Sequence, residues 1–305
     1  MFKSVGWTWN PISGCTHDCK YCWAKSLSDR YGRSFEPQLK EKFFKDKMPN
    51  DGSWVFVGSM GDTFCEGVPD EWILKLLGFI KKDKSNNVFL LQTKNPARFH
   101  EEDITYDLEE IKDKVILGTT LETTYDTSEW SKAPPPYERA YSLINKKRDG
   151  FRTFLSLEPL AEFDLKMMKR WITEINPEAI EIGLENYTSF TTKPSDEKII
   201  ELVHWIDSND FNYVLKENLS WLSIDSDING VPDMSKERLE KITLRNSAKG
   251  ACSHESDTKR IDGHNCAFYG HQDQCPVPYD EPVNCSLFHL CETVTTQNKH
   301  RKRSL

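Results

Sequence analysis

The chain has 305 residues, of which 37% are hydrophobic and 29% are charged, and its formal net charge is −8. This length is sufficient for one large α/β domain with a small appendage. The excess of acidic residues argues against broad, sequence-independent binding to nucleic acid. No apolar run is long enough to span a bilayer, and the first residues lack the basic-then-apolar pattern of a signal peptide. We therefore expect a cytoplasmic protein with no membrane association.

Short apolar runs rich in β-forming residues recur along the chain, with room for a helix between most of them. They are Trp7–Trp9, Trp54–Val57, Val88–Gln92, Val115–Thr119, Thr153–Leu157, Ala179–Ile182 and Tyr213–Lys216. Helical periodicity is typical of Asp70–Lys81, Leu165–Ile175 and Glu197–Ile206. Strands that alternate with helices form right-handed βαβ units and a parallel sheet. The sequence therefore predicts an α/β fold, a partial or near-complete parallel (β/α) barrel over residues 1–222.

Polar or charged motifs follow most of these strands, at the edge where parallel barrels carry their chemistry. They are Ser59-Met60-Gly61-Asp62, Thr93-Lys94-Asn95, Thr120-Leu121-Glu122, Glu158-Pro159 and Glu185-Asn186. Each motif alone is also explained as a turn or as the N-cap of the next helix. For Glu158, which precedes a proline, we favour a functional role or a salt bridge.

A cysteine-rich loop follows the first predicted strand. Cys15, Cys19 and Cys22 have the spacing C-x3-C-x2-C, with Tyr21 before the last cysteine. Three thiolates so spaced can hold one face of a cubane cluster and leave the fourth iron without a protein ligand. Structural zinc usually takes four protein ligands in two close pairs, so only a Cys3His site that uses His17 keeps zinc as an alternative. The loop favours a [4Fe–4S] cluster with an open iron.

This loop resembles the hallmark of the radical S-adenosylmethionine (SAM) superfamily. In that superfamily SAM chelates the open iron, and its reductive cleavage gives a 5′-deoxyadenosyl radical. Further motifs over residues 7–220 resemble a phage-associated radical SAM family of unassigned function and, more distantly, spore photoproduct lyase-like proteins. They are Trp9-Asn10-Pro11, Gly58-Ser59-Met60-Gly61-Asp62, Val68-Pro69-Asp70-Glu71, Thr93-Lys94-Asn95-Pro96 and Phe154-Leu155-Ser156-Leu157-Glu158-Pro159-Leu160. The cysteine spacing here is the compact superfamily form, whereas many members of the phage-associated family have a longer first gap.

The resemblance implies roles for the motif after the second barrel strand. Ser59, Met60, Gly61 and Asp62 occupy the place of the superfamily's GGE-like motif, which binds the SAM amino group. Asp62 stands where a glutamate is usual, so its reach is shorter. Cys65 lies just past this motif, and its thiol is a candidate hydrogen donor to a product radical, as in spore photoproduct lyase. The other interpretation of Cys65 is a small buried apolar residue.

Further cofactor contacts are implied by the same resemblance. Lys94 would pair with the SAM carboxylate, Glu122 would bind the ribose hydroxyls, and Glu158 is a further cofactor-binding candidate. Tyr21 would shield the cluster and offer backbone groups to the adenine. The alternative for Lys94 and Glu122 is a salt bridge across the barrel rim. An electron donor such as ferredoxin or flavodoxin is the implied partner.

The composition changes after the predicted barrel. Residues 223–246 are predicted to form a linker and a helix, and residues 247–305 a cysteine-rich extension with a basic tail and too few apolar residues for its own core. Its cysteines are Cys252, Cys266, Cys275, Cys285 and Cys291. In a reducing compartment, metal is the usual means of ordering such a segment. We therefore expect a second site there, with either another Fe–S cluster or zinc.

The expected function is that of a radical SAM enzyme acting on a nucleic-acid base or nucleotide, and the substrate part rests on the resemblance alone. One alternative is a radical SAM enzyme that modifies a peptide or protein, which the possible second cluster motivates. The other is a non-catalytic zinc-binding module that holds nucleic acid through its tail.

Overall fold

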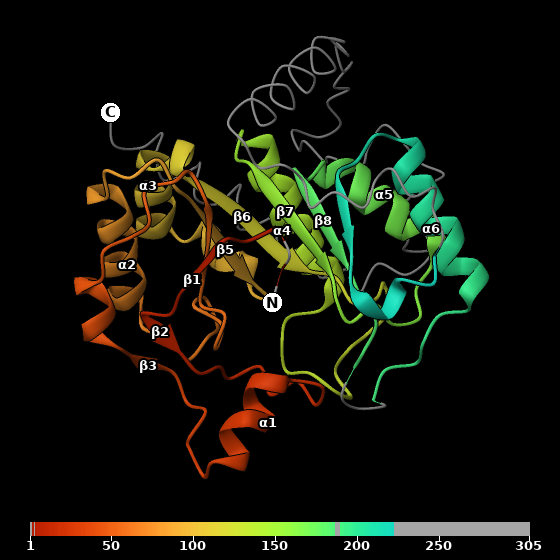
Figure 1. Ribbon diagram of the computed structural model, residues 1–305, viewed down its shortest axis with the longest axis horizontal. Helices are drawn as coiled ribbons and strands as arrows, with labels where there is room; N and C mark the ends of the chain where they lie inside the picture. The colour runs from red at the N-terminus through yellow and green to blue at the C-terminus, as the bar shows by residue number, and fades with distance from the viewer. Residues whose placement is uncertain (1, 3, 187–189, 223–305) are drawn as a thin grey trace, which may run out of the picture. The chain divides into compact units, whose positions relative to one another are not determined.

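A computed structural model describes residues 2, 4–186 and 190–222. Within these residues the main element is a seven-stranded parallel sheet, in the order β1-β4-β5-β6-β7-β8-β9 (Figure 1). Its strands are β1 (Trp7–Trp9), β4 (Trp54–Val57), β5 (Val88–Thr93), β6 (Val115–Thr120), β7 (Thr153–Leu157), β8 (Ala179–Ile182) and β9 (Tyr213–Leu215). The edge strands β1 and β9 do not pair with each other, so the sheet is an open half-barrel. The predicted partial parallel barrel is confirmed.

Two predicted segments lie outside the described residues. These are the linker over 223–246 and the cysteine-rich extension over 247–305, with its candidate ligands Cys252, Cys266, Cys275, Cys285 and Cys291. The second metal site therefore stays a prediction.

The central strands are buried on both faces. Every residue of β6, β7 and β8 is buried, which explains why these strands carry apolar residues on both faces rather than in strict alternation with polar ones. One face packs against the helices in the larger apolar core. The opposite face carries a smaller cluster of Val5, Trp54, Leu90, Ile116, Phe154 and Ala179, with Phe2 against it.

The connecting helices cover one face of the sheet. They are α2 (Asp70–Lys82), α3 (Glu102–Glu110), α4 (Pro136–Arg148), α5 (Leu165–Ile175) and α6 (Asp196–Ser208). In α2 the buried residues Ile73, Leu76, Leu77 and Ile80 follow the helical period and form the stripe that faces the strands. The short 3-10 helices are η1 (Glu41–Lys45), η2 (Pro96–His100), η3 (Lys112–Lys114) and η4 (Glu217–Leu219).

Some elements were not among those predicted individually. They are α1 (Trp23–Arg30), α3, α4 and the two-stranded antiparallel sheet of β2 (Ile12–Ser13) and β3 (Gln38–Leu39). Helix α3 buries only Ile104 and Leu108, and α4 buries Arg139 and Lys146 among its apolar residues, so neither shows a clear apolar stripe. In Figure 1, α1 lies apart from the helices that cover the sheet.

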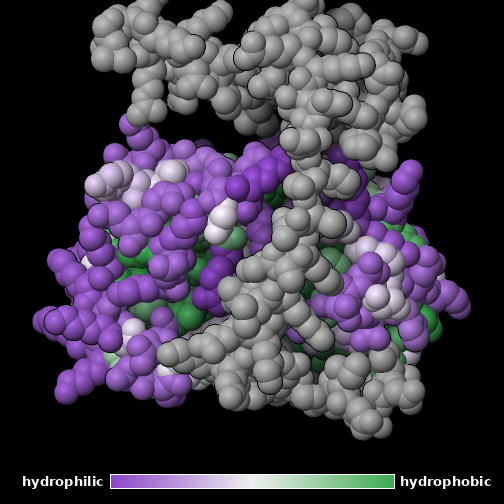
Figure 2. Space-filling model, turned by 90° about the horizontal axis from the view of Figure 1, so that it is seen from above, coloured by the Kyte–Doolittle hydropathy of each residue, from purple (hydrophilic) through white to green (hydrophobic). Residues whose placement is uncertain are grey.

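On the face shown in Figure 2, most of the coloured side chains are hydrophilic, with hydrophobic ones between them. Among the described residues, the helices are all too short or too polar to cross a membrane.

Candidate functional site

Residues 14–22, which we call the cysteine loop, connect β2 to α1. Gly14 has a φ of +88°, and a Cβ there would lie 2.2 Å from a backbone oxygen of the facing segment. Its N–H donates to the carbonyl oxygen of Met60 at 3.0 Å, and the N–H of Asp62 donates to the Gly14 carbonyl at 3.1 Å. A Cβ on Gly61 would lie 2.2 Å from that same carbonyl oxygen. The two glycines therefore let the cysteine loop and the Ser59–Asp62 motif meet backbone to backbone.

The three thiols of the loop are free and have different partners. The Cys15 sulfur accepts the backbone N–H of His17 at 3.4 Å, and the Cys22 sulfur accepts a backbone N–H of the first turn of α1 at 3.4 Å. The Cys19 sulfur lies 3.1 Å from the hydroxyl of Ser131. Hydrogen bonds to cysteine sulfurs are among the means by which proteins tune Fe–S clusters.

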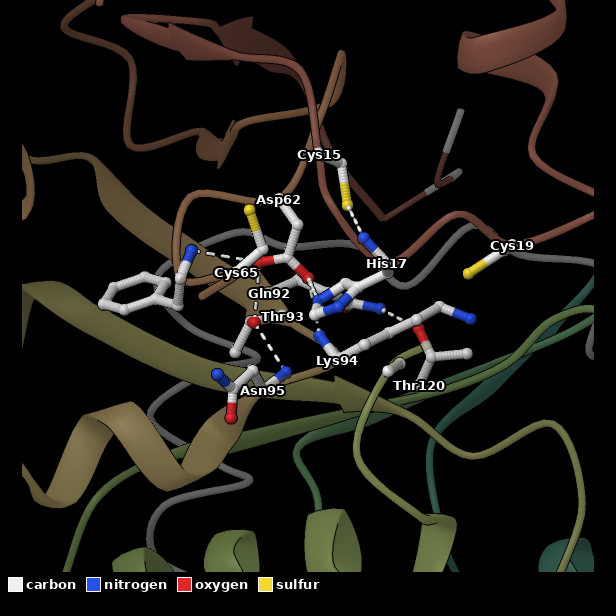
Figure 3. Close-up of polar contacts among 12 residues, drawn as sticks. Cys15, His17, Cys19, Asp62, Cys65, Gln92, Thr93, Lys94, Asn95 and Thr120 are labelled. Carbon is white, nitrogen blue, oxygen red and sulfur yellow. Dashed lines mark hydrogen bonds and ion pairs between the residues drawn. The ribbon is translucent and has the colours of Figure 1, made fainter. Parts of the chain in front are cut away.

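The donor set fits a [4Fe–4S] cluster in chemical type. In Figure 3 Cys15 and Cys19 lie apart, and among the described residues no three His, Cys, Asp or Glu side chains are grouped to hold a metal ion. The thiols must therefore turn toward one another to bind a cluster. The ring of His17 is directed at Asp62, so the Cys3His zinc arrangement is not formed either.

Asp62 is the centre of a buried hydrogen-bond network (Figure 3). One carboxylate oxygen lies 3.0 Å from His17 Nε2 and accepts the Lys94 backbone N–H at 2.8 Å. The other accepts the hydroxyl of Thr93 at 2.7 Å and the N–H of Phe64 at 3.0 Å. Burial raises the pKa of Asp62, but His17 and these hydrogen bonds outweigh burial and hold that pKa below its usual value.

Glu122 is fully buried between two cations. One of its oxygens accepts a hydrogen bond from Arg139 Nη1 at 2.7 Å, and the other contacts the Lys94 ammonium and the Tyr21 hydroxyl. Burial raises the pKa of Glu122, but the charges of Arg139 and Lys94 outweigh it and lower that pKa to about 2. Burial, followed by the charge of Glu122, raises the pKa of Tyr21 well above its usual value. The rim salt bridge, our alternative for Lys94 and Glu122, is present.

Cys65 is buried beside the cysteine loop. The neighbouring Cys15 side chain lowers the pKa of Cys65 to about 6, and Cys65 in turn raises the pKa of Cys15. Both interpretations of Cys65 are compatible with this place, because the side chain is buried yet touches a predicted cluster ligand. The hydrogen-donor role stays a prediction.

The Ser59–Met60 segment is held by Asn10, which follows β1. The Asn10 side-chain oxygen accepts the Ser59 hydroxyl and the Met60 backbone N–H, each at 3.1 Å. Asn10 therefore ties the end of β1 to the loop after β4. This contact gives the Asn-Pro motif before the cysteines a structural role.

Glu158 lies on the same edge but outside the network of Asp62 and Glu122. It forms an ion pair with Lys216 at 3.4 Å, and Lys216 also lies 2.8 Å from the buried Glu181. The other oxygen of Glu181 accepts the N–H and the hydroxyl of Ser4, at 2.9 and 2.6 Å. Burial raises the pKa of Glu158. The salt-bridge interpretation of Glu158 accounts for these contacts.

Sequence reasoning missed three participants in these networks. His17 was considered only as a zinc ligand, and Arg139 and Ser131 were not considered. Arg139 lies on a helix whose polar sequence gave no signal, and Ser131 meets Cys19 across 112 positions of the chain. An acid that follows a buried strand, as Glu122 does, indicates that a buried cation will pair with it. Which residue supplies that cation depends on the fold.

The fold and the site together define an α/β half-barrel protein with a buried polar network and a three-thiol loop at the C-terminal ends of its strands. The chain belongs to the family described as Protein of unknown function (DUF5131), whose family model matches residues 3–173. No curated protein matches the chain.

Some solved structures are similar to this chain at low sequence identity. A double mutant of spore photoproduct lyase with bound AdoMet and dinucleoside spore photoproduct has a TM-score of 0.49 at 10% identity, over 68% of this chain and 75% of that one. SuiB of Streptococcus suis, bound to S-adenosylmethionine, has a TM-score of 0.44 at 11% identity, over 69% of this chain and 50% of that one.

Proposed function

We propose that this protein is a radical SAM enzyme that acts on a nucleic-acid base or nucleotide. The proposal extends the sequence resemblance to the phage-associated radical SAM family and to spore photoproduct lyase-like proteins. The observation that carries the chemistry is a three-thiol loop docked by the Gly14–Gly61 contact onto the motif after β4. When both are bound, a reduced [4Fe–4S] cluster and SAM supply a 5′-deoxyadenosyl radical.

The side chains around this loop would bind and orient the cofactors. Cys15, Cys19 and Cys22 would hold the cluster. Lys94 is the candidate partner of the SAM carboxylate, and its side chain is 16% exposed, so it can turn from its buried partner Glu122 to a ligand. Glu122 would likewise bind the ribose hydroxyls only after giving up one of its contacts with Lys94, Tyr21 or Arg139.

Asp62 and the segment before it remain the proposed site of the SAM amino group. Both carboxylate oxygens of Asp62 already accept hydrogen bonds, so the SAM amino group must replace one of the present donors. The backbone of Ser59 and Met60, which Asn10 holds in place, offers further polar groups. Tyr21 would cover the cluster from the side of Lys94, whose ammonium lies 4.6 Å from the centroid of its ring.

Other parts of the proposal concern the surroundings of the reaction. A ferredoxin or flavodoxin would deliver the electron. The cysteine-rich extension would hold a second Fe–S cluster or zinc, and the cytoplasm is the compartment in which these thiols stay reduced. Cys65 would return a hydrogen atom to the product radical.

The substrate part is supported by exposed aromatic side chains on the segments that follow the strands. These side chains are Trp23, Tyr31, Tyr125, Phe190 and Trp221. Several have a cation over the ring, as with Arg33 5.3 Å from the Tyr31 centroid and Lys20 5.8 Å from that of Phe190. Exposed rings with neighbouring cations are the means by which proteins hold single-stranded nucleic acid, because each base stacks on a ring.

The chemistry is tested by 5′-deoxyadenosine release from SAM after anaerobic iron and sulfide reconstitution and chemical reduction. The wild-type protein should release it, and the triple variant Cys15→Ala, Cys19→Ala, Cys22→Ala should not. Ser28→Ala, on the helix that follows the loop, serves as the matched control and should behave as wild type. Continued reductive cleavage by the triple variant would refute the proposed cluster site.

The substrate class is tested by fluorescence anisotropy with a short labelled oligodeoxythymidylate at low salt. Trp23→Ala and Tyr31→Ala should each weaken binding about five- to a hundredfold, the range for loss of one stacked base. Tyr106→Ala removes a ring that is 68% exposed on α3, away from these segments, and should leave binding unchanged. The nucleic-acid proposal is contradicted if the wild-type protein binds no oligonucleotide, or if Tyr106→Ala weakens binding as much as Trp23→Ala and Tyr31→Ala. Either result would favour the peptide-modifying alternative.

A further inference from the structure

His17 lies in the middle of the cysteine loop, yet it is only 3% exposed. Three of its groups are engaged by different parts of the protein. Its backbone N–H donates to the Cys15 sulfur at 3.4 Å, and its carbonyl accepts the Lys132 N–H at 2.6 Å. Its ring nitrogen Nε2 lies 3.0 Å from Asp62. An ionised carboxylate only accepts hydrogen bonds, so Nε2 is the donor of this pair.

Asp62 connects this ring to the end of the next strand. The same carboxylate accepts the Thr93 hydroxyl and the Lys94 N–H at the end of β5. Its charge is also close to the cluster site. The backbone N–H of Asp62 donates to the carbonyl of Gly14, the residue before Cys15, at 3.1 Å. The loop, the end of β5 and the first predicted cluster ligand thus meet at one carboxylate.

We propose that His17 and Asp62 are a positioning pair for the cysteine loop. Through Asp62, the imidazole fixes the loop to the end of β5. Its hydrogen bond also offsets the negative charge of Asp62 beside Cys15. The anchoring part concerns the protein alone, whereas the electrostatic part rests on the cluster of the proposed function. Two measurements separate these parts.

The anchoring part is measured by amide hydrogen exchange in the full-length protein before any iron is added. The amides of Cys15, Lys20 and Lys132 donate across the docked loop, at 2.8, 2.9 and 2.6 Å, so they report its opening. His17→Leu should speed their exchange about ten- to a hundredfold, the worth of a hydrogen bond to a charged group. His17→Gln, which keeps a donor, should restore protection. His100→Leu, a histidine outside the loop, should change nothing there. Equal protection in His17→Leu and wild type would overturn the positioning pair.

The electrostatic part is measured by redox titration of the reconstituted cluster, followed by electron paramagnetic resonance. His17→Leu leaves the Asp62 charge without its donor and should make the potential more negative. Asp62→Asn removes the charge and should make it more positive. We expect about tenfold in the one-electron reduction equilibrium for each, which is about 59 mV. His17→Gln should titrate as wild type. Shifts in the same direction, or none, would overturn the electrostatic part. If wild-type protein takes up no cluster, the proposed function fails and the exchange result alone decides the pair.

Discussion

Glu122→Gln is the substitution with the most clearly defined expected effect. It keeps the shape of the side chain but removes the negative charge from a fully buried site between Arg139 and Lys94. Removal of one partner from a buried ion pair leaves the other charge uncompensated, and this costs about 3–5 kcal/mol. We therefore expect a large loss of stability at neutral pH.

The pKa of Glu122 gives an independent magnitude. A fall from the ordinary 4.5 to about 2 corresponds to roughly 3 kcal/mol of stability at neutral pH. Because the pKa is lower in the folded state, this contribution is present above about pH 4.5 and is lost as the pH falls through about 2. At low pH the wild-type side chain is protonated and resembles glutamine. The difference between wild type and Glu122→Gln should therefore shrink over that range.

The assay is urea unfolding of the full-length proteins, followed by circular dichroism at several pH values from neutral to acidic. Glu41→Gln is the matched control, because Glu41 pairs with Lys75 on the surface and both side chains are exposed. It should cost less than about 1 kcal/mol at every pH. A loss below about 1 kcal/mol for Glu122→Gln, or a loss that does not change with pH, would refute the reasoning.

Two further predictions concern the loop contact and the extension. Gly61→Ala should destabilise the protein by about 1–3 kcal/mol in urea unfolding, because its Cβ would lie 2.2 Å from the Gly14 carbonyl oxygen. Gly78→Ala in α2 meets nothing within 4 Å and should instead stabilise by about 0.5–1 kcal/mol; similar effects for both would contradict the contact argument. Truncation at Lys249 should lower the iron or zinc per chain while the cluster of Cys15, Cys19 and Cys22 is retained. Equal metal content in the full-length and truncated proteins, by elemental analysis, would show that the extension binds none.

The central strands of the sheet were predictable because they are buried on both faces. The predicted Val115–Thr119 and Thr153–Leu157 agree with β6 and β7 to within one residue. Such strands carry apolar residues on both faces, so their signal does not depend on register. Helix α4 lacked an equally clear signal because its inner face includes Arg139 and Lys146.

The site was predictable as a set of loops but not as a set of contacts. Position after a strand was enough to select Asp62, Lys94 and Glu122, because parallel strands bring their C-terminal ends to one edge. The partners of these residues depend on packing between distant segments, as with Glu122 and Arg139. The pairing of His17 with Asp62 spans 45 positions and leaves no pattern in the sequence.

The two edge strands of the sheet have a consequence for self-association. Within the described residues, β1 pairs only with β4 and β9 only with β8, and each edge strand is three residues long. An edge this short offers an incoming strand few backbone groups, so another copy gains little by adding to it. A design that lengthens Trp7–Trp9 or Tyr213–Leu215 removes this protection and creates a template for fibrous aggregation.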